Sequence, residues 1–179
     1  MAIVERPQVT QPSEEAPVPA NRDLRLERLY TRDLVHVRAF LDRVLPVHYS
    51  ASFLLHFITA NDSHLLTVRD GCSGTILGVV AGRLSRSALD ANAVTGHVMI
   101  LAVDEHSRRL GIGTFLMRQL EFVFRSARSS LQALILQVES SNVPALTFYS
   151  SLGFHPERHL SGYYQQSGDG LLMRKSFSV

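Results

Sequence analysis

Apolar and polar residues alternate along the first third of the chain in patterns that change from one segment to the next. Residues 24–29 alternate with a period of two and predict a short strand. Apolar residues at helical spacing then predict a helix that ends near Val44, because Pro46 cannot continue it. Ser50 precedes a second apolar helical pattern that reaches about Thr59, as an N-cap residue would. The pattern therefore predicts one strand followed by two helices.

Later segments alternate between strand and helix. Residues 63–69 and 75–84 flank a glycine-bearing turn and predict a hairpin, and the polar, alanine-rich segment 85–95 predicts a loop. The nearly continuous apolar runs 97–103 and 131–138 predict strands buried on both faces. The remaining predicted elements are helices over 114–127 and from Asn142 to Gly153, and strands over 154–159 and 171–176. This order predicts an α/β fold with some parallel pairing.

Composition limits the domain count and the class of partner. A chain of 179 residues with 45% hydrophobic residues is expected to form one domain, here residues 23–179. Residues 1–22 contain four prolines and little apolar periodicity, and are expected to be a disordered or extended leader. A net charge of +2 without a long basic block argues against nucleic-acid binding.

Cysteine, signal and metal features are sparse. Cys72 is the single cysteine, so an internal disulfide is excluded and a reducing compartment is expected. The sequence has no apolar signal core and no run of eighteen apolar residues, so we expect a cytoplasmic protein without a membrane span, with the nucleus as an alternative location. The histidines are scattered, and Pro156 argues against a helix that would align His155 with His159. We expect no metal site.

A glycine-bearing segment follows the strand predicted over 97–103. It consists of Arg108, Arg109, Leu110, Gly111, Ile112, Gly113 and Thr114. The first amides of a helix have no intrahelical acceptor, and the helix dipole favours an anion there. The segment matches neither the P-loop nor the dinucleotide fingerprint. On its own residues, it fits a phosphate site and an ordinary turn with solvated arginines equally well.

Four segments together resemble the GNAT family of N-acetyltransferases. The strand with its glycine turn resembles the family's acetyl-CoA loop, and residues 136–154 resemble its second cofactor segment. Residues 45–49 resemble the substrate loop of protein N-terminal acetyltransferases, and Tyr163-Tyr164 resembles their paired tyrosines between the last two strands. Order and spacing are similar to the Naa50-type catalytic subunit of NatE, with the Naa60 type as a near neighbour. The resemblance implies a mixed sheet of about seven strands, splayed at its centre, with about four helices.

The resemblance implies acetyl-CoA as the cofactor. Its pantetheine arm would bond to the backbone of Leu101, Ala102 and Val103, and its pyrophosphate would lie on the segment from Arg108 to Thr114. Asn142, Ala145 and Tyr149 would complete the site, with Asn142 and Tyr149 facing the thiol. Two alternatives remain open, because Asn142 could be a plain helix cap and Tyr149 could belong to the core.

The implied reaction is attack of a neutral amine on a thioester. A protein α-amine has a pKa near 8, so roughly a quarter is neutral at pH 7.4 and positioning can supply much of the catalysis. Naa50-type enzymes carry a Tyr and a His as the proton-handling pair, and this chain has His97 and Gln137 there. His97 could act as a base through water, whereas Gln137 could only orient water. With Tyr149 these residues form the candidate catalytic set. The alternatives are a structural His97 and weakened or lost catalysis.

The resemblance also implies a peptide site and protein partners. Leu45, Pro46, Val47, Tyr49 and Met99 would shape a pocket for the first residue, and Tyr49, Tyr163 and Tyr164 would bond the peptide backbone. Leu45 stands where an aromatic residue is common, and the two tyrosines could instead pack in a turn beside Gly162. The family context implies a large ribosome-associated auxiliary subunit and a second catalytic subunit.

These expectations give a leading function and two alternatives. The leading one is an N-alpha-acetyltransferase that moves acetyl from acetyl-CoA to protein N-termini, especially those starting with Met, by direct attack in a ternary complex. The first alternative is a weakly active or inactive acetyl-CoA-binding subunit, motivated by His97 and Gln137. The second is a GNAT enzyme for lysine or a small amine, which the segment 45–49 and the paired tyrosines argue against.

Overall fold

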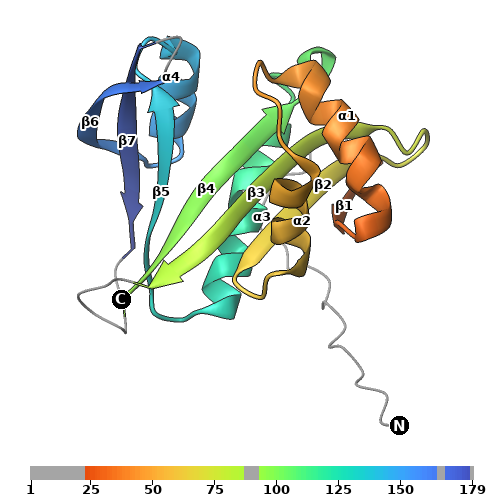
Figure 1. Cartoon of the computed structure of the whole chain (residues 1–179), viewed down its shortest axis with the longest axis horizontal. Coiled ribbons are helices and arrows are strands. Elements are labelled where there is room, and N and C mark those ends of the chain that lie inside the picture. Colours follow the sequence, from red (N-terminus) through yellow and green to blue (C-terminus); the bar gives the residue numbers. More distant parts are fainter. Residues whose placement is uncertain (1–22, 87–92, 165–167, 178–179) are drawn as a thin grey trace, which may run out of the picture.

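The computed structural model describes residues 23–86, 93–164 and 168–177, which form one sheet flanked by helices (Figure 1). The strands are β1 (Leu24–Arg28), β2 (Ser63–Asp70), β3 (Ile76–Arg86), β4 (Val94–Val103), β5 (Leu131–Glu139), β6 (His155–Tyr164) and β7 (Gly168–Ser176). The helices are α1 (Leu34–Val44), α2 (Ala51–Thr59), α3 (Ile112–Ala127) and α4 (Val143–Ser151), with 3₁₀ turns at Thr31–Asp33 and Glu105–Ser107. The prediction for residues 1–22 lies outside the described residues.

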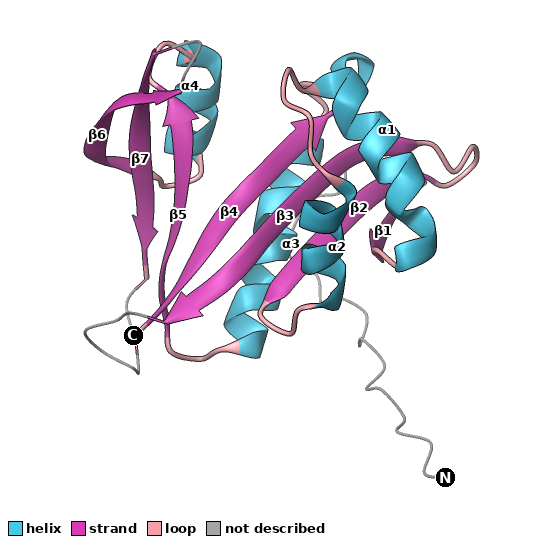
Figure 2. Cartoon of the chain, in the orientation of Figure 1, coloured by secondary structure: helices cyan, strands magenta, loops and turns pink. Residues whose placement is uncertain are grey.

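Helices cover both faces of the sheet (Figure 2). Leu41 of α1 and Leu54 of α2 pack in one buried cluster with Val79 of β3, and this side is called the α1–α2 face below. Leu116 of α3 packs in a second cluster with Val80 of β3 on the opposite side, the α3 face. Residues of α4 also pack against the second cluster, so α4 lies on the α3 face. The sheet is therefore the middle layer of three.

The seven strands have the order β1-β2-β3-β4-β5-β7-β6. All neighbours are antiparallel except β4 and β5, whose parallel pairing runs from Val94↔Leu131 only to His97↔Ile135. Beyond that pair the described parts of the two strands diverge, as Figure 1 shows. We call this divergence the β4–β5 fork. The mixed seven-stranded sheet with four helices and splayed central strands confirms the expected fold class.

A bulge in β4 lies at the start of the fork. Ala81 of β3 pairs with Ile100, whereas the next residue, Gly82, pairs with Val98, so Met99 is the extra residue. Val98 belongs to the α3-face cluster and Ile100 to the α1–α2-face cluster. The extra residue therefore reverses the faces of the strand, and one apolar run contributes to both cores.

The structure corrects the prediction that 97–103 and 131–138 are buried on both faces. Burial alternates along both strands, and the odd-numbered residues of β4 are only half-buried. Because the bulge at Met99 reverses the faces of β4, its half-buried residues lie on the α1–α2 face up to Met99 and on the α3 face at Leu101 and Val103. Neither face of β4 is therefore covered along its whole length.

Several element boundaries differ from the sequence prediction, and three of these differences bear on the site. Helix α3 begins at Ile112 rather than at Thr114, and β6 runs to Tyr164 rather than ending at 159. Tyr163 and Tyr164 therefore lie within a strand and not in a turn between strands. The segment 85–95 was predicted as a loop, but its ends belong to β3 and β4, and residues 87–92 lie outside the described residues. The hairpin of β2 and β3 is confirmed.

Candidate active site

The N-terminus of α3 presents backbone donors at the open end of the fork. Gly111 is the N-cap, with a left-handed φ of 82°, and no side chain caps the helix. The first intrahelical bond runs from the Phe115 amide to the Gly111 carbonyl at 2.9 Å. The amides of Ile112, Gly113 and Thr114 therefore have no acceptor within the helix. Together with the helix dipole they can bind an anionic group.

Gly113 allows α3 to approach α4. A Cβ at this position would lie 3.2 Å from the ring of Phe148 on α4 and 3.7 Å from Val103 on β4. Such distances are at or below ordinary van der Waals contact, so a larger side chain would push these elements apart. The glycine therefore sets the spacing between the end of β4, the start of α3 and the side of α4.

The α4 residues of the predicted cofactor site have structural roles. The side-chain oxygen of Asn142 accepts from the Ala145 amide at 3.1 Å, which confirms its role as the α4 cap. Tyr149 packs edge-on against Phe148 and Phe154, with ring centroids 5.2 and 5.9 Å apart. Ala145 is half-buried against the α3-face cluster. Asn142 and Tyr149 therefore fix the start of α4 and its packing on the α3 face.

The predicted pantetheine strand lies along the fork. Leu101, Ala102 and Val103 pair with β3 on one side, and their other edge faces the diverging β5. The Val103 carbonyl already accepts from Nε of Arg108 at 3.3 Å. Arg109 and Leu110 are exposed, and Arg109 adopts a left-handed φ of 63°. The turn thus holds one arginine against β4 and leaves the other at the surface.

A buried carboxylate links the turn after β4 to the end of α1. Asp104 is 9% exposed, and its Oδ1 accepts from Nη1 of Arg43 at 2.8 Å. Its Oδ2 accepts from the His106 amide at 3.2 Å. This ion pair connects the end of α1, just before the predicted substrate loop, to the segment between β4 and the glycine turn.

The C-terminal end of the predicted substrate loop packs against α2. Tyr49 stacks on Phe53 of α2 with centroids 5.3 Å apart, and Ser50 caps α2 by accepting from the Phe53 amide. Leu45 is half-buried, whereas Pro46 and Val47 are exposed. Burial raises the pKa of the Tyr49 phenol, which therefore remains a hydrogen-bond donor at neutral pH.

Tyr164 lies within electrostatic reach of tyrosines from two distant segments, Tyr49 and Tyr149. Burial raises the pKa of Tyr164, and Tyr163, Glu139 and Tyr49 raise it further. Burial and the neighbouring Tyr164 raise the pKa of Tyr149 to about 12. The rings of Tyr163 and Tyr164 lie edge to face at 5.0 Å. The α1–α2 loop, α4 and β6 thus present protonated phenols near one site.

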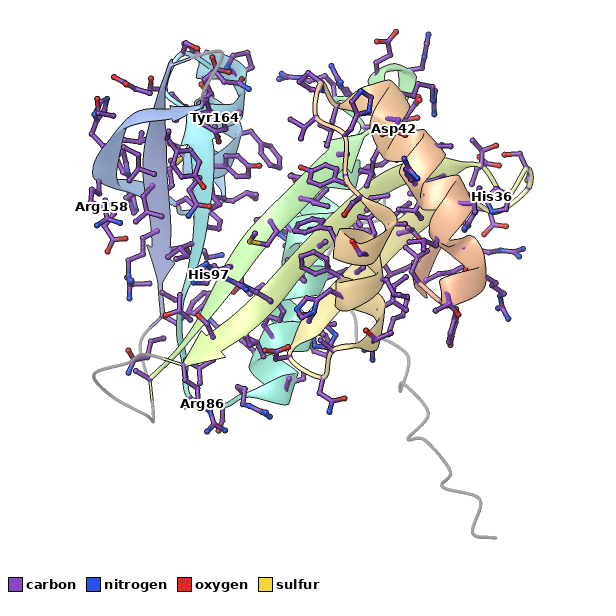
Figure 3. The ribbon with its side chains drawn as sticks, viewed as in Figure 1. His36, Asp42, Arg86, His97, Arg158 and Tyr164 are labelled. Carbon is purple, nitrogen blue, oxygen red and sulfur yellow. The ribbon has the colours of Figure 1, made fainter. Side chains whose placement is uncertain are left out.

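His97 lies where β4 and β5 converge, and Tyr164 lies towards their diverging ends (Figure 3). His97 is half-buried between its strand partners Arg83 and Ile135. Burial lowers the pKa of His97, and the positive charge of Arg83 lowers it further. The imidazole is therefore neutral at neutral pH and can accept a proton.

Gln137 shares a face with His97, whereas Tyr149 does not. Ile135 pairs with His97 and shares its face, and Gln137 is two residues further along β5. Leu136 packs in the α3-face cluster, so Gln137 points to the α1–α2 face. Tyr149 packs against the α3-face cluster. The structure thus puts His97 and Gln137 on the same face of the sheet and Tyr149 on the other.

Glu139 is a charged residue of this region that the sequence reasoning missed. It follows Gln137 at the same two-residue spacing, so it points to the α1–α2 face. Its Oε1 accepts from the Ser141 hydroxyl at 2.8 Å, and its charge acts on Tyr164. The strand period could have identified it, because Ile135, Gln137 and Glu139 are spaced by two.

Neither a group of metal ligands nor a membrane-spanning helix occurs in the described part of the chain. Its His, Cys, Asp and Glu side chains form no group of three or more that could hold a metal. None of its helices is both long enough and apolar enough to span a bilayer.

Curated relatives match most of this chain. An uncharacterised N-acetyltransferase of Methanocaldococcus jannaschii is 28% identical over 84% of this chain and 90% of its own length. The N-alpha-acetyltransferase of Sulfurisphaera tokodaii is 28% identical over 72% of this chain and 78% of its own length. The N-terminal acetyltransferase A complex catalytic subunit NAA10 of Arabidopsis thaliana is 28% identical over 84% and 77%.

Solved structures share the fold. Arabidopsis thaliana NAA60 in complex with a bisubstrate analogue has a TM-score of 0.75 and 20% identity, covering 86% of this chain and 97% of that chain. Arabidopsis thaliana Naa50 in complex with the bisubstrate analogue CoA-Ac-MVNAL has a TM-score of 0.73 and 22% identity, covering 86% and 99%. The two scores do not separate the Naa50 type from the Naa60 type. The family model described as the acetyltransferase (GNAT) family matches residues 25–154, and the chain therefore belongs to this family.

Proposed function

We propose that this chain is an acetyl-CoA-dependent N-alpha-acetyltransferase that acts on protein N-termini. One observation carries the proposal: the fork places uncapped α3 amides, a neutral His97 and the protonated tyrosines around the divergence of β4 and β5. Relatives named N-alpha-acetyltransferases support this activity. At the level of the branch, we propose a Naa50-like enzyme of the NatE type.

The residues at the α3 end of the fork fit acetyl-CoA. The uncapped amides of Ile112, Gly113 and Thr114 suit a pyrophosphate, with Arg108 and Arg109 adding positive charge. The β5-facing edge of Leu101–Val103 suits the amides of a pantetheine arm, because it lacks a partner strand among the described residues. Bound acetyl-CoA would supply a thioester carbonyl carbon, which bonds to the amine nitrogen while its bond to sulfur breaks.

The chain's own residues then position the amine and handle its proton. Neutral His97 accepts the amine proton directly or through a water that Gln137 orients. Tyr149 retains its proton up to a pH of about 12 and donates a hydrogen bond at the thiol end. Because roughly a quarter of protein α-amines are already neutral at pH 7.4, positioning can supply much of the remaining effect.

For the peptide, we propose Met-starting N-termini. Leu45, Val47 and Met99 supply apolar surface for a first side chain, while Tyr49 and Tyr164 supply phenol donors for the peptide backbone. The analogue bound to the Naa50 relative carries a peptide that begins with Met. The NAA10 relative is named as the catalytic subunit of an N-terminal acetyltransferase complex, which supports the proposal that this chain also acts within a complex. We propose a large ribosome-associated auxiliary subunit, a second catalytic subunit and a cytoplasmic location.

The test is acetyl transfer to a peptide panel. It contains Met-Leu, Met-Lys and Ser-Glu N-termini and an N-blocked peptide with an internal lysine, measured with the wild-type chain and His97→Ala. We expect turnover on the Met peptides alone, with His97→Ala lowering kcat more than peptide affinity. Equal turnover of the blocked peptide would refute N-terminal selectivity, and an unchanged kcat in His97→Ala would make that residue structural.

Gln137 keeps one alternative open. Because glutamine cannot accept a proton at neutral pH, a weakly active or inactive acetyl-CoA-binding subunit remains a second candidate. It predicts that acetyl-CoA raises the melting temperature without turnover on any peptide. Gln137→His would then restore transfer, because a titratable group would return to the fork.

A further inference from the structure

We propose that the carboxylate of Glu139 is a specificity-determining group that selects peptides with a cationic side chain at the second residue. The inference rests on the proposed N-alpha-acetyltransferase function and deepens it. It concerns the open end of the fork, where Glu139 is the last residue of β5. It therefore lies along the path of a peptide whose amine reaches Gln137.

Position along the strand gives the register. Gln137 and Glu139 share the α1–α2 face, and two strand residues span about 7 Å. A peptide with its amine at Gln137 that extends towards the open end places its second Cα roughly 4 Å further on. A lysine or arginine side chain is long enough to cover the remaining distance to Glu139. A side chain at the first residue would instead face the apolar substrate loop.

The Glu139 carboxylate has one hydrogen-bonded oxygen and one that a ligand can reach. Ser141 donates to Oε1 at 2.8 Å, and in the described ranges Oε2 makes no hydrogen bond or ion pair. Gly170, its partner on β7, has no side chain, and Tyr163 packs over that glycine with its Cβ 3.1 Å from where a Cβ would lie. One oxygen is therefore available to a cation beside an aromatic ring.

The groups that share the α1–α2 face with Glu139 set the charge that a peptide meets there. Its titratable neighbour Tyr164 is protonated, because burial raises the pKa of that phenol. On the same face, Arg83 pairs with His97 and Arg174 pairs with Ile135 at the converging end, while Arg158 lies on the outer strand β6, across Leu172 from Gln137. Negative charge at the open end and positive charge at the converging end favour a cation near Glu139 and disfavour an acidic second residue.

The experiment measures kcat/KM for Met-Lys, Met-Gln and Met-Glu peptides that are identical beyond the second residue. Attraction and repulsion of a partly exposed charge pair are each worth about threefold to fivefold, so Met-Lys should exceed Met-Glu by roughly tenfold. Glu139→Gln should reduce that ratio towards one, and Glu139→Lys should invert it. Salt at about 0.5 M should compress the wild-type ratio through screening.

A matched control is Glu27→Gln, which removes one carboxylate from β1 at the opposite side of the sheet and should leave the ratio unchanged. Thermal melts establish that each variant folds. If wild type acetylates all three peptides equally, or if Glu139→Gln lowers all three equally, the inference is overturned while the proposed function stands. If no peptide is acetylated at all, the proposed function fails first.

Discussion

Lowering the pH from 7 to 5 should destabilise this protein through His64, a buried histidine of β2. The side chain is 8% exposed, its ring lies 5.7 Å from that of Phe124, and its Nε2 has no hydrogen-bond partner among the residues that the structure describes. Burial and the positive charge of Arg28, partly opposed by Asp62, together lower the pKa of His64 to about 4. Folding therefore favours the neutral imidazole.

The sign and size of the effect follow from proton linkage. Between pH 6.5 and 4 the unfolded chain binds more protons at His64, so the free energy of unfolding falls as the pH falls. With a pKa of about 4 in the folded state and 6.5 in the unfolded state, the loss is about 0.2 kcal/mol at pH 7 and about 2 kcal/mol at pH 5. The contribution is fully present only above pH 6.5.

Urea unfolding at both pH values measures this loss. With a slope of about 2 kcal/mol/M, the wild-type midpoint should fall by about 1 M between pH 7 and pH 5 through this residue. His64→Leu removes the titrating group and its unpaired nitrogen. Its midpoint should therefore fall by about 1 M less than the wild-type midpoint between pH 7 and pH 5. The control His36→Leu, on the exposed surface of α1, should keep the wild-type fall. Equal falls in wild type and His64→Leu would refute the linkage argument.

Three other changes test the region of the fork. Arg83→Gln should move the acid limb of kcat/KM to higher pH, because the arginine adds to burial in lowering the pKa of His97; an unmoved limb would remove His97 as the base. Arg109→Gly should leave stability unchanged or raise it by up to about 1 kcal/mol, because a left-handed φ of 63° strains a residue with a Cβ, while acetyl-CoA affinity measured by calorimetry falls severalfold. Gly96→Ala should cost about 1–3 kcal/mol in urea unfolding, because its Cβ would lie 2.5 Å from Leu134; a smaller loss would mean that β4 and β5 can separate further.

Local patterns in the sequence were sufficient for the elements with clear end signals. The helix α2 begins after Ser50 because the hydroxyl accepts from the Phe53 amide, and α4 begins after Asn142 by the same chemistry. The start of α3 was placed two residues late, because Gly113 looked like part of a turn. Glycine in the first turn is instead explained by the nearness of Phe148, which no local pattern reveals.

The candidate site depended more on tertiary structure than on pattern. The pairing of His97 with Ile135, which places Gln137 on the same face, requires the strand register. The bulge at Met99 was also invisible, because one extra apolar residue in an apolar run changes no pattern of composition. Glu139 was overlooked because the predicted strand ended at residue 138, whereas β5 continues to Glu139.

The fork gives this sheet four edges instead of two. Besides the outer edges of β1 and β6, the diverging parts of β4 and β5 each carry backbone donors and acceptors without a strand neighbour among the described residues. Unpaired edges are templates for pairing with other chains. A ligand that lies along β4 would act as a surrogate strand and block one of them. The solubility of this enzyme during expression and storage should therefore depend on how fully the fork is occupied.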